Sequence, residues 1–407
     1  MMRALLMPVG SHGDVLPLLG LGQALQNHAG WKATAFISPV FIAAANAAGV
    51  GHRTIGSLED YQQAENDPDL HHPQRGVKAV GRVLGKFMRL SYECLLRELD
   101  SSSEPAVLIG TTLAYPVRIL QEQRGLPTVM VHLSPAVFRS NLTPPVLLPS
   151  GPLPGWLPTW LLKIYWWLAD RLMIDRLLGR PFNQFRRELG LQPVRRIMDS
   201  WMHQVDLSLA LFPEWFFRAP DWPANLIQTD FPLYDRDRDD RLEPDLQAWL
   251  EAGEAPVIIT GGSAFANRRP FYQECLDAVR SLGRRALVVT RHDSNVPEDC
   301  RRVEYAPFSQ LLPRGAVLIH HGGIGTVAQS LASGIPQLIV PQAHDQFDNA
   351  YRVEQMGAGL WSRGRLVHDL GQVLKLPRRP HRMQSGLTRA AELITSLANL
   401  PPGNGCA

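Results

Sequence analysis

The chain has 407 residues, of which 45% are hydrophobic and 19% charged, a length and composition that predict a globular protein of two domains. Its formal net charge of +3 is nearly balanced, which argues against a general nucleic-acid-binding protein, so we expect no nucleic acid among its partners. Its four cysteines are too few for a disulfide framework in a chain of this length, so we expect a reducing, cytoplasmic location.

Short apolar runs alternate with helical segments along both halves of the chain. The runs do not alternate apolar with polar residues, so we expect strands that are covered on both faces. Strand–helix alternation predicts parallel sheets with right-handed crossovers, that is, doubly wound (Rossmann-like) α/β domains. The expected strands are Arg3–Val9, Trp31–Ile37, Ala106–Ile109, Thr128–Leu133, Leu207–Leu211, Asn225–Gln228, Pro256–Thr260, Ala286–Thr290, Val303–Tyr305, Ala316–Ile319 and Gln337–Val340.

The first expected strand ends in the turn PVGSHGDVLP, residues 8–17, which leads into a helix. His12 and Asp14 would therefore lie at the carboxyl edge of the first sheet. A carboxylate there can take the proton of an acceptor hydroxyl, and its ordinary pKa of about 3.9 predicts that proton transfer is concerted with bond formation. The imidazole of His12, with an ordinary pKa of about 6.5, is better matched to neutral pH. The alternatives are that Asp14 only caps the helix and that His12 only faces water.

A segment rich in tryptophan and arginine, residues 156–187, follows in the first half. Lys163, Asp170 and Arg171 interrupt its apolar stretch, so it does not read as a membrane span. Tryptophan together with basic residues suits a membrane interface, and it also suits a channel for a hydrophobic acceptor. We therefore predict a lipid-like acceptor and peripheral contact with the inner face of the membrane. The alternative is a helix whose tryptophans pack in the core.

A charged, turn-rich stretch, Pro232–Pro244, separates the two halves and is read as a linker. It predicts an N-terminal acceptor-binding domain at residues 1–235 and a C-terminal nucleotide-sugar-binding domain at residues 236–385. A C-terminal helix and tail would then occupy residues 386–407. Two doubly wound domains facing each other would form a cleft lined by the carboxyl ends of both sheets, where ligands of open α/β sheets bind.

The most informative segment is the glycine-rich sequence VLIHHGGIGT at residues 317–326. It predicts a buried strand, a tight turn and a helix start, where backbone N–H groups can hold a diphosphate. Three glycines would let the chain approach the phosphates and two side chains would add donors: Gly322, Gly323, Gly325, His321 and Thr326. Asp345 and Gln346 follow one strand later, where they could bind the hydroxyls of a sugar. Together these residues predict a nucleotide-sugar site.

Two other interpretations of this segment stay open. The first is a tight turn with a purely structural role. The second is a dinucleotide site, as in a dehydrogenase, because GIGTVA fits G-x-G-x-x-A and Asp345 follows Gly325 by twenty residues. The position of the motif deep in the second half, and of Asp345 beyond Pro341, counts against the dinucleotide.

Two motifs, GSHGDVLP near the start and HHGGIGTVAQSLASGIPQLIVPQAHDQFDN late in the chain, resemble those of family 1 glycosyltransferases of GT-B architecture. The segments WMHQVDLSLALFPEWFFRAPDWPANLIQTDFPLYD and VEYAPFSQLLP look most like the rhamnosyltransferases of the rhamnolipid-forming type, and sterol glucosyltransferases are also similar. The resemblance implies an inverting transfer by direct displacement, with neither metal nor cofactor. A hexose, rhamnose or glucose, would pass from a dTDP or UDP sugar to a hydroxyl of a hydrophobic small molecule or lipid.

The same resemblance implies roles for single residues. Asp14 falls where the family places its catalytic base, and His12 is a further candidate that is not a fixed family feature. The residues implied to bind the nucleotide sugar are Gly13, Gly262, Ser263, Tyr305, Ala306, His321, Gly322, Gly323, Gly325, Thr326, Gln329, Asp345 and Gln346. Tyr305 replaces a tryptophan of plant members and Gln329 replaces their ribose-binding glutamate, so the nucleobase stays open.

Three rival functions remain beside this one. A glucosyltransferase that uses UDP-glucose and acts on a sterol or a secondary metabolite would share every motif. A non-hydrolysing nucleotide-sugar epimerase would share the architecture but would need acid and base carboxylates around the sugar. A non-catalytic nucleotide-sugar sensor would bind the donor without turning it over.

Overall fold

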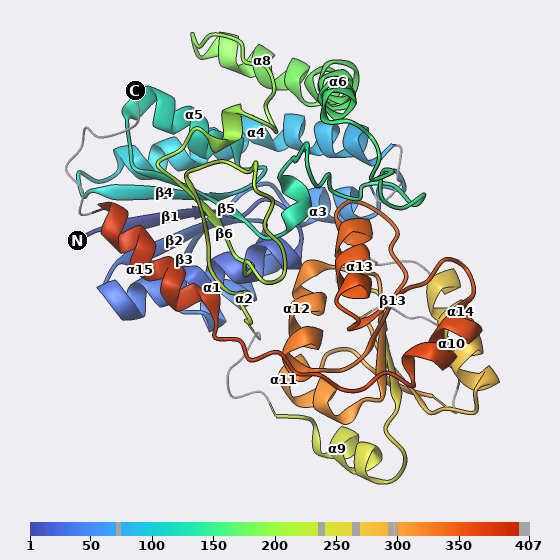
Figure 1. Ribbon diagram of the computed structural model, residues 1–407. Helices are drawn as coiled ribbons and strands as arrows, with labels where there is room; N and C mark the ends of the chain where they lie inside the picture. The colour runs from blue at the N-terminus through green and yellow to red at the C-terminus, as the bar shows by residue number, and fades with distance from the viewer. Residues whose placement is uncertain (71–74, 235–240, 263–268, 292–296, 298–299, 399–407) are drawn as a thin grey trace. The chain divides into compact units, whose positions relative to one another are not determined.

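The computed structural model describes residues 1–70, 75–234, 241–262, 269–291, 297 and 300–398. Its contacts group the chain into two units, residues 1–145, 153–234 and 385–407 in the first and residues 146–152 and 235–384 in the second. Each unit is built on one sheet whose paired strands are all parallel (Figure 1). The predicted doubly wound α/β class is confirmed. The grouping differs from the consecutive domains expected at 1–235, 236–385 and 386–407, because residues 146–152 join the second unit and the C-terminal helix joins the first.

The sheet of the first unit has the strand order β3-β2-β1-β4-β5-β6-β7. The chain first builds outward from β1 and then returns to add β4 on its other side, so the topological switch point lies between β1 and β4. The strands are β1 (Arg3–Met7), β2 (Lys32–Ile37), β3 (Gly51–Thr54), β4 (Ala106–Thr111), β5 (Thr128–His132), β6 (Leu207–Ala210) and β7 (Leu226–Gln228).

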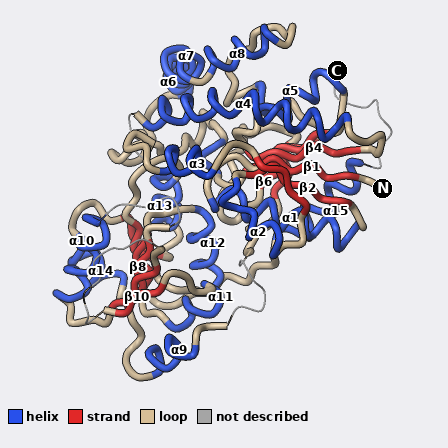
Figure 2. Tube along the Cα trace, turned by 180° about the vertical axis from the view of Figure 1, so that it is seen from behind, coloured by secondary structure: helices blue, strands red, loops and turns tan. Residues whose placement is uncertain are grey.

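Helices cover both faces of this sheet (Figures 1 and 2). The first unit contains α1 (His12–Ala29), α2 (Ile42–Ala47), α3 (Leu58–Glu65), α4 (Gly76–Asp100), α5 (Tyr115–Arg124), α6 (Thr159–Ala169), α7 (Asp175–Leu177), α8 (Gly179–Glu188) and α15 (Gly386–Ala398). Helices α4 and α5 lie on one face, and α1, α2 and α15 lie on the other. Helices α6 and α8 lie outside α4, on its side away from the sheet. The C-terminal helix packs along α1, which explains its place in this unit.

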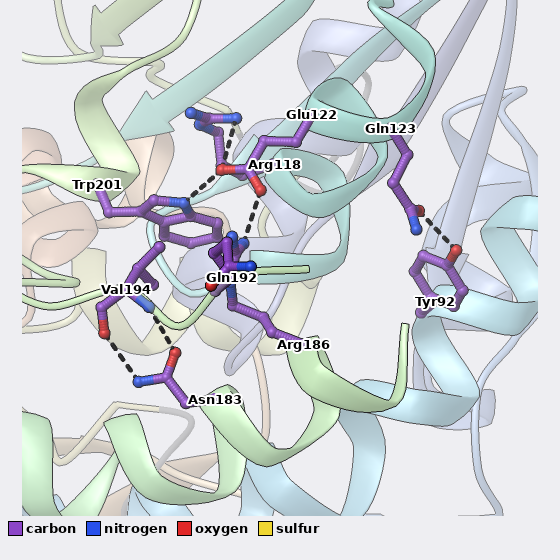
Figure 3. Close-up of polar contacts among 9 residues, drawn as sticks. All are labelled: Tyr92, Arg118, Glu122, Gln123, Asn183, Arg186, Gln192, Val194 and Trp201. Atoms are coloured by element: carbon purple, nitrogen blue, oxygen red, sulfur yellow. Dashed lines mark hydrogen bonds and ion pairs between the residues drawn. The ribbon is translucent and has the colours of Figure 1, made fainter. Parts of the chain in front are cut away.

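A polar network fastens α8 and the segment that follows it to α5 (Figure 3). The Glu122 carboxylate of α5 accepts hydrogen bonds from Trp201 Nε1 and Arg186 Nη1, both at 2.7 Å, and pairs with Arg118 at 3.3 Å. Asn183 of α8 exchanges two 2.8 Å hydrogen bonds with the backbone of Val194. The helical layer outside α4 is therefore anchored by a carboxylate shared between two buried arginines.

The second unit has the strand order β10-β9-β8-β11-β12-β13, and its switch point lies between β8 and β11. Its strands are β8 (Val257–Thr260), β9 (Ala286–Val289), β10 (Arg301–Val303), β11 (Val317–His320), β12 (Gln337–Ile339) and β13 (Gly359–Trp361). Its helices are α9 (Pro244–Glu251), α10 (Arg269–Ser281), α11 (Phe308–Leu311), α12 (Ile324–Ser333), α13 (Gln346–Gln355) and α14 (Leu366–Val373). Alternate residues of β8 and β11 enter two cores, one under α10 and α14 and the other under α9 and α11.

The short segment 146–152 of the second unit hydrogen-bonds to a buried ion pair of α13. The Asp348 carboxylate of α13 is fully buried and accepts the Val146 N–H at 3.0 Å. Arg352, one turn further along α13, donates to the same carboxylate at 2.6 and 3.0 Å. Three hydrogen bonds thus satisfy a charge that would otherwise be costly to bury.

Candidate functional site

The glycine-rich turn follows β11 at the carboxyl edge of the second sheet, beside the switch point. The His321 imidazole, 8% exposed, lies directly against two glycines. A β-carbon on Gly323 would lie 2.6 Å from His321 Nε2, and one on Gly262, which follows β8, would clash with His321 Cε1. Any side chain at either position would displace the ring. The structure therefore brings together three predicted residues from the two strands that flank the switch point.

Gly322 is held by the strand that precedes it. Its N–H donates to His320 Nδ1 at 3.1 Å, and the other ring nitrogen of His320 contacts Gln337 Oε1 at 3.0 Å. Since Nδ1 accepts, the imidazole hydrogen belongs on Nε2, which donates to Gln337. Burial lowers the pKa of His320 to about 4, against the opposing effect of the Gln337 hydrogen bond, so the ring is neutral near pH 7. Gly322 has φ +94, a conformation that favours glycine.

The predicted sugar-binding pair lies at the start of α13. The Asp345 carboxylate accepts Asn349 Nδ2 at 2.9 Å, and the same nitrogen donates to the Gly322 carbonyl at 2.9 Å. The Gln346 side chain is buried, and its Oε1 accepts the N–H groups of Gln342 and Ala343 at 2.8 and 3.1 Å. The structure thus places Asp345 and Gln346 next to the glycine-rich turn.

The first turn of α12 has the properties expected of an anion site. Its N-cap is Gly323, which has no side chain to cap the helix, and the first N–H groups of an α-helix find no partner within it. A β-carbon on Gly325 would meet no atom within 4 Å, so the space beside this residue is open. Thr326 lies in the same turn, and Gln329 lies one turn further along, half-buried.

The remaining residues predicted for the nucleotide are less closely grouped. Tyr305 and Ala306 follow β10, at the edge of the sheet, with Tyr305 exposed and Ala306 buried. Ser263 lies outside the described residues. Among the residues that are described, no group of three or more histidine, cysteine or carboxylate side chains is arranged to hold a metal ion.

In the first unit, Asp14 occupies the third position of α1 and closes a capping box. Its Oδ2 accepts the Ser11 N–H at 2.9 Å, and Ser11 caps the helix in return through a 3.3 Å hydrogen bond from the Gly13 N–H. Capping is therefore one role of this carboxylate, which is half-buried. The His12 ring lies edge-on to Phe41, with ring centres 4.8 Å apart. Both residues sit after β1, beside the switch point of the first sheet, as the sequence predicts.

Two buried histidines of the first unit lie close together, and the sequence did not single them out. His132 ends β5 and contacts the Thr112 hydroxyl at 3.0 Å, and its ring centre lies 5.2 Å from that of His203. Burial, with His203 nearby, holds the pKa of His132 well below its ordinary value, and burial lowers the pKa of His203 to about 4. Phe138 stacks on His203. The two neutral imidazoles therefore lie together in an aromatic environment.

Residues 156–187 divide into a buried and an exposed side. Trp166 is buried and donates to the Ser140 carbonyl at 3.2 Å, whereas Trp156, Trp160 and Trp167 are 78%, 61% and 55% exposed. The prediction that tryptophans pack in the core therefore holds for Trp166. None of the described helices is both long and apolar enough to cross a bilayer.

Two residues of the second unit were missed by the sequence analysis, His320 and Asn349. Asn349 donates to the predicted residues Gly322 and Asp345, and His320 contacts the predicted Gly322 as well as Gln337. A signal for Asn349 was present, because it follows Asp345 by four residues on a helix, a spacing that brings two side chains together. His320 gave a weaker signal, as a polar residue at the end of a buried strand.

Sequence comparison relates the chain to enzymes of antibiotic biosynthesis. Residues 277–370 match the family described as Erythromycin biosynthesis protein CIII-like, C-terminal domain. The chain is 26% identical to O-mycaminosyltylonolide 6-deoxyallosyltransferase of Streptomyces fradiae, over 88% of this chain and 84% of that protein. It is 28% identical to vancomycin aglycone glucosyltransferase of Amycolatopsis orientalis, over 88% and 85% of the two chains.

Structural comparison agrees on the fold. The glycotransferase of kitacinnamycin superposes with a TM-score of 0.71 and 21% identity, over 98% of both chains. The spinosyn rhamnosyltransferase SpnG, solved with thymidine diphosphate, superposes with a TM-score of 0.60 and 18% identity, over 98% of this chain and 96% of that one. The fold shared with these proteins is the GT-B fold that the sequence motifs predicted.

Proposed function

We propose that this chain, a family 1 glycosyltransferase of GT-B fold that uses nucleotide sugars, transfers a hexose to the hydroxyl of a hydrophobic, lipid-like alcohol with inversion and without a metal. The observation that carries the proposal is the turn after β11. There the His321 imidazole lies against Gly323, the glycine N-cap of α12. Asn349 links the Asp345 carboxylate to the carbonyl of the neighbouring Gly322.

The donor diphosphate binds at the first turn of α12 in this proposal. The N–H groups of the turn and the helix dipole favour an anion, and the open space beside Gly325 receives it. His321 donates to the same diphosphate, where negative charge grows as the sugar leaves. Asp345 binds the sugar hydroxyls, and Gln346 joins it through its amide nitrogen, because its oxygen is engaged by the loop backbone.

The reaction is a single displacement. The acceptor oxygen forms a bond to C1 of the sugar, the bond from C1 to the diphosphate oxygen breaks, and the hydroxyl proton passes to Asp14. The leaving nucleoside diphosphate keeps the electron pair of the broken bond. Tyr305 and Gln329 contact the nucleoside, and His12 assists proton transfer. We place thymidine with rhamnose first among the donors and uridine with glucose second.

A screen of the purified protein against nucleotide sugars tests the donor. A bound ligand raises the thermal midpoint by mass action, so dTDP-rhamnose should raise it more than UDP-glucose. Incubation of the stabilising donor with a 3-hydroxy fatty acid and with a sterol then tests the transfer. An epimerized sugar in the absence of any acceptor would contradict the proposal in favour of an epimerase. Donor binding without turnover on either acceptor would favour a sensor.

The acceptor proposal includes contact with the inner face of the cytoplasmic membrane through residues 156–187. Their exposed charged side chains are all basic: Lys163, Arg171, Arg176, Arg180 and Arg187. The two acidic residues of the segment are engaged, Asp170 with Arg139 at 2.5 Å and Asp175 with the Arg196 N–H at 3.1 Å. Exposed tryptophans next to basic side chains suit an anionic lipid surface, where each lysine or arginine contributes about 1 kcal/mol.

Vesicle sedimentation tests this contact. The protein should sediment with vesicles that contain phosphatidylserine, and the double variant Trp160→Ala with Trp167→Ala should sediment less. Trp215→Ala, which removes an exposed tryptophan outside the segment, is the matched control and should behave as the wild type. Equal sedimentation of all three proteins, or none, would contradict the membrane contact.

A further inference from the structure

One side-chain amide links the two halves of the donor site. Asn349 lies on α13 and is fully buried. Its Nδ2 carries two hydrogens, and the two acceptors at 2.9 Å are the Gly322 carbonyl and Asp345 Oδ2. The first acceptor belongs to the turn proposed to hold the diphosphate, and the second belongs to the carboxylate proposed to hold the sugar.

The turn at the other end of this link has little freedom to move. Gly322 donates its N–H to His320 Nδ1, and its carbonyl accepts from Asn349, so both polar groups of this peptide backbone are engaged. A β-carbon at Gly322 would lie 2.8 Å from Ile339 Cγ2 and 3.1 Å from the Gln346 carbonyl oxygen. The turn is therefore a fixed reference, and the position of Asp345 is set relative to it by Asn349.

We infer that Asn349 is a positioning residue that aligns Asp345 with the diphosphate turn, so that the site favours a nucleotide sugar over the free nucleotide. The inference rests on the proposed function, since it needs a donor that spans both groups. Asn349 touches neither the diphosphate nor the sugar in this account. It acts through Asp345, because a half-buried carboxylate with one oxygen fixed by a hydrogen bond presents its other oxygen in one direction.

The test compares the binding of two ligands by the wild type and four variants. Binding of the donor that stabilises the wild type, dTDP-rhamnose or UDP-glucose, and of the matching free diphosphate, dTDP or UDP, is measured by calorimetry. Asn349→Ala should weaken the nucleotide sugar about ten- to a hundredfold, the range for a hydrogen bond to a charged group, and the free nucleotide less than about threefold. Asp345→Ala should show the same pattern.

The double variant decides whether the two residues act as one. If Asn349 works through Asp345, adding Asn349→Ala to Asp345→Ala should change the sugar affinity by less than about twofold. The inference would be overturned if the losses of affinity in the two single variants multiplied in the double variant. It would also be overturned if Asn349→Ala weakened binding of the nucleotide sugar and of the free nucleotide equally. Gln355→Ala removes an exposed amide from the same helix and should change neither affinity.

Folding is checked by thermal melting of each variant. If Asn349→Ala does not fold, Asn349→Asp, which has nearly the same size, replaces it in the same comparison. Failure of both to fold would assign Asn349 a structural role only and overturn the inference. A wild type that binds neither nucleotide nor nucleotide sugar would overturn the proposed function itself. If the wild type binds the nucleotide sugar and the losses of affinity in Asn349→Ala and Asp345→Ala multiply in the double variant, only the positioning role is overturned.

Discussion

The carboxylate of Asp14 serves a helix cap and, in the proposed reaction, a proton transfer. The two roles need different properties of the same group. A cap needs an oxygen that accepts the Ser11 N–H, and an amide oxygen can do this as well as a carboxylate. A base needs a lone pair that binds a proton, which an amide lacks at neutral pH. An isosteric substitution therefore separates them.

Asp14→Asn should lower turnover by about 10²- to 10⁴-fold, the usual contribution of general base catalysis. Donor affinity should stay near that of the wild type, and the thermal midpoint should change little because the cap is retained. Ser11→Ala is the control, since it removes the capping hydroxyl at a cost of about 1 kcal/mol but leaves the carboxylate. Turnover of Asp14→Asn close to the wild-type rate would eliminate Asp14 as the base.

His321→Ala should weaken binding of the donor and of the free nucleotide by about tenfold or more, and lower turnover as well. The reason is that the imidazole is proposed to donate to the diphosphate, which both ligands contain. His368→Ala removes an exposed histidine on α14 and should leave both affinities unchanged. An unchanged nucleotide affinity in His321→Ala would contradict the phosphate role.

Among the elements, α8 and the segment that follows it are joined to α5 through one carboxylate of α5. Glu122 accepts from Arg186 and Trp201 and pairs with Arg118, and both arginines are buried. Burial lowers the pKa of Arg118, and Glu122 opposes that shift. Removing the acid would take the paired carboxylate from two buried guanidinium groups.

Glu122→Ala should therefore lower the free energy of unfolding by about 3 kcal/mol, the lower end for breaking a buried ion pair, since Glu122 is partly exposed. Urea denaturation followed by tryptophan fluorescence measures it. Glu188→Ala breaks an exposed pair with Arg89 and should cost less than about 1 kcal/mol. Similar losses in the two variants would mean that the Glu122 network contributes no more than a surface pair.

The central strands and the edge strand β7 were predictable from their apolar runs, whereas two of the other edge strands were not predicted and the third was displaced. β3 (Gly51–Thr54) has the sequence GHRT and is largely exposed, because it pairs on one side only and needs no apolar residues. β13 (Gly359–Trp361) has only three residues, too few for a pattern. β10 was expected at Val303–Tyr305 and is found at Arg301–Val303, also at an edge.

In the candidate site, the residues that follow strand ends were predictable from the sequence, and those placed by packing were not. Gly262, His321 and Asp345 follow the carboxyl ends of parallel strands, and topology alone brings such residues to one edge. Asn349 and His320 each also hydrogen-bond to a residue that is distant in the sequence, Gly322 and Gln337 respectively, and these contacts depend on the packed structure. The capping contact of Asp14 was among the alternatives, because Asp near a helix start is a common cap.

At the scale of the whole molecule, both units bury neutral histidines, His132 and His203 in the first and His320 in the second. The pKa values of His203 and His320 fall from 6.5 to about 4, and that of His132 also falls, in each case chiefly through burial. At a pH under 6.5 the unfolded protein therefore binds more protons than the folded protein does. The stability that these residues contribute is complete above about pH 6.5 and is lost as the pH falls towards 4.

The urea midpoint should accordingly fall between pH 7 and pH 4.5, while it should change little between pH 7 and pH 8. Each of His203 and His320 can account for up to about 3 kcal/mol at the acid end, by the free energy of a pKa shift of this size. His203→Gln should flatten the dependence, and His368→Gln, which alters an exposed ring, should not. A midpoint that is constant down to pH 4.5 would contradict the assignment.

The ion pair on α13 has a consequence for chimaeric enzymes. Exchanging the second half of the chain at residue 235 would import Asp348 and Arg352 but leave the recipient's own loop in place of residues 146–152. The imported carboxylate would then lose the backbone amide of Val146 unless that loop happened to supply another. Crossover points for recombination should therefore transfer this seven-residue segment together with the rest of the second unit, although residues 153–234 of the first unit separate the two in the sequence.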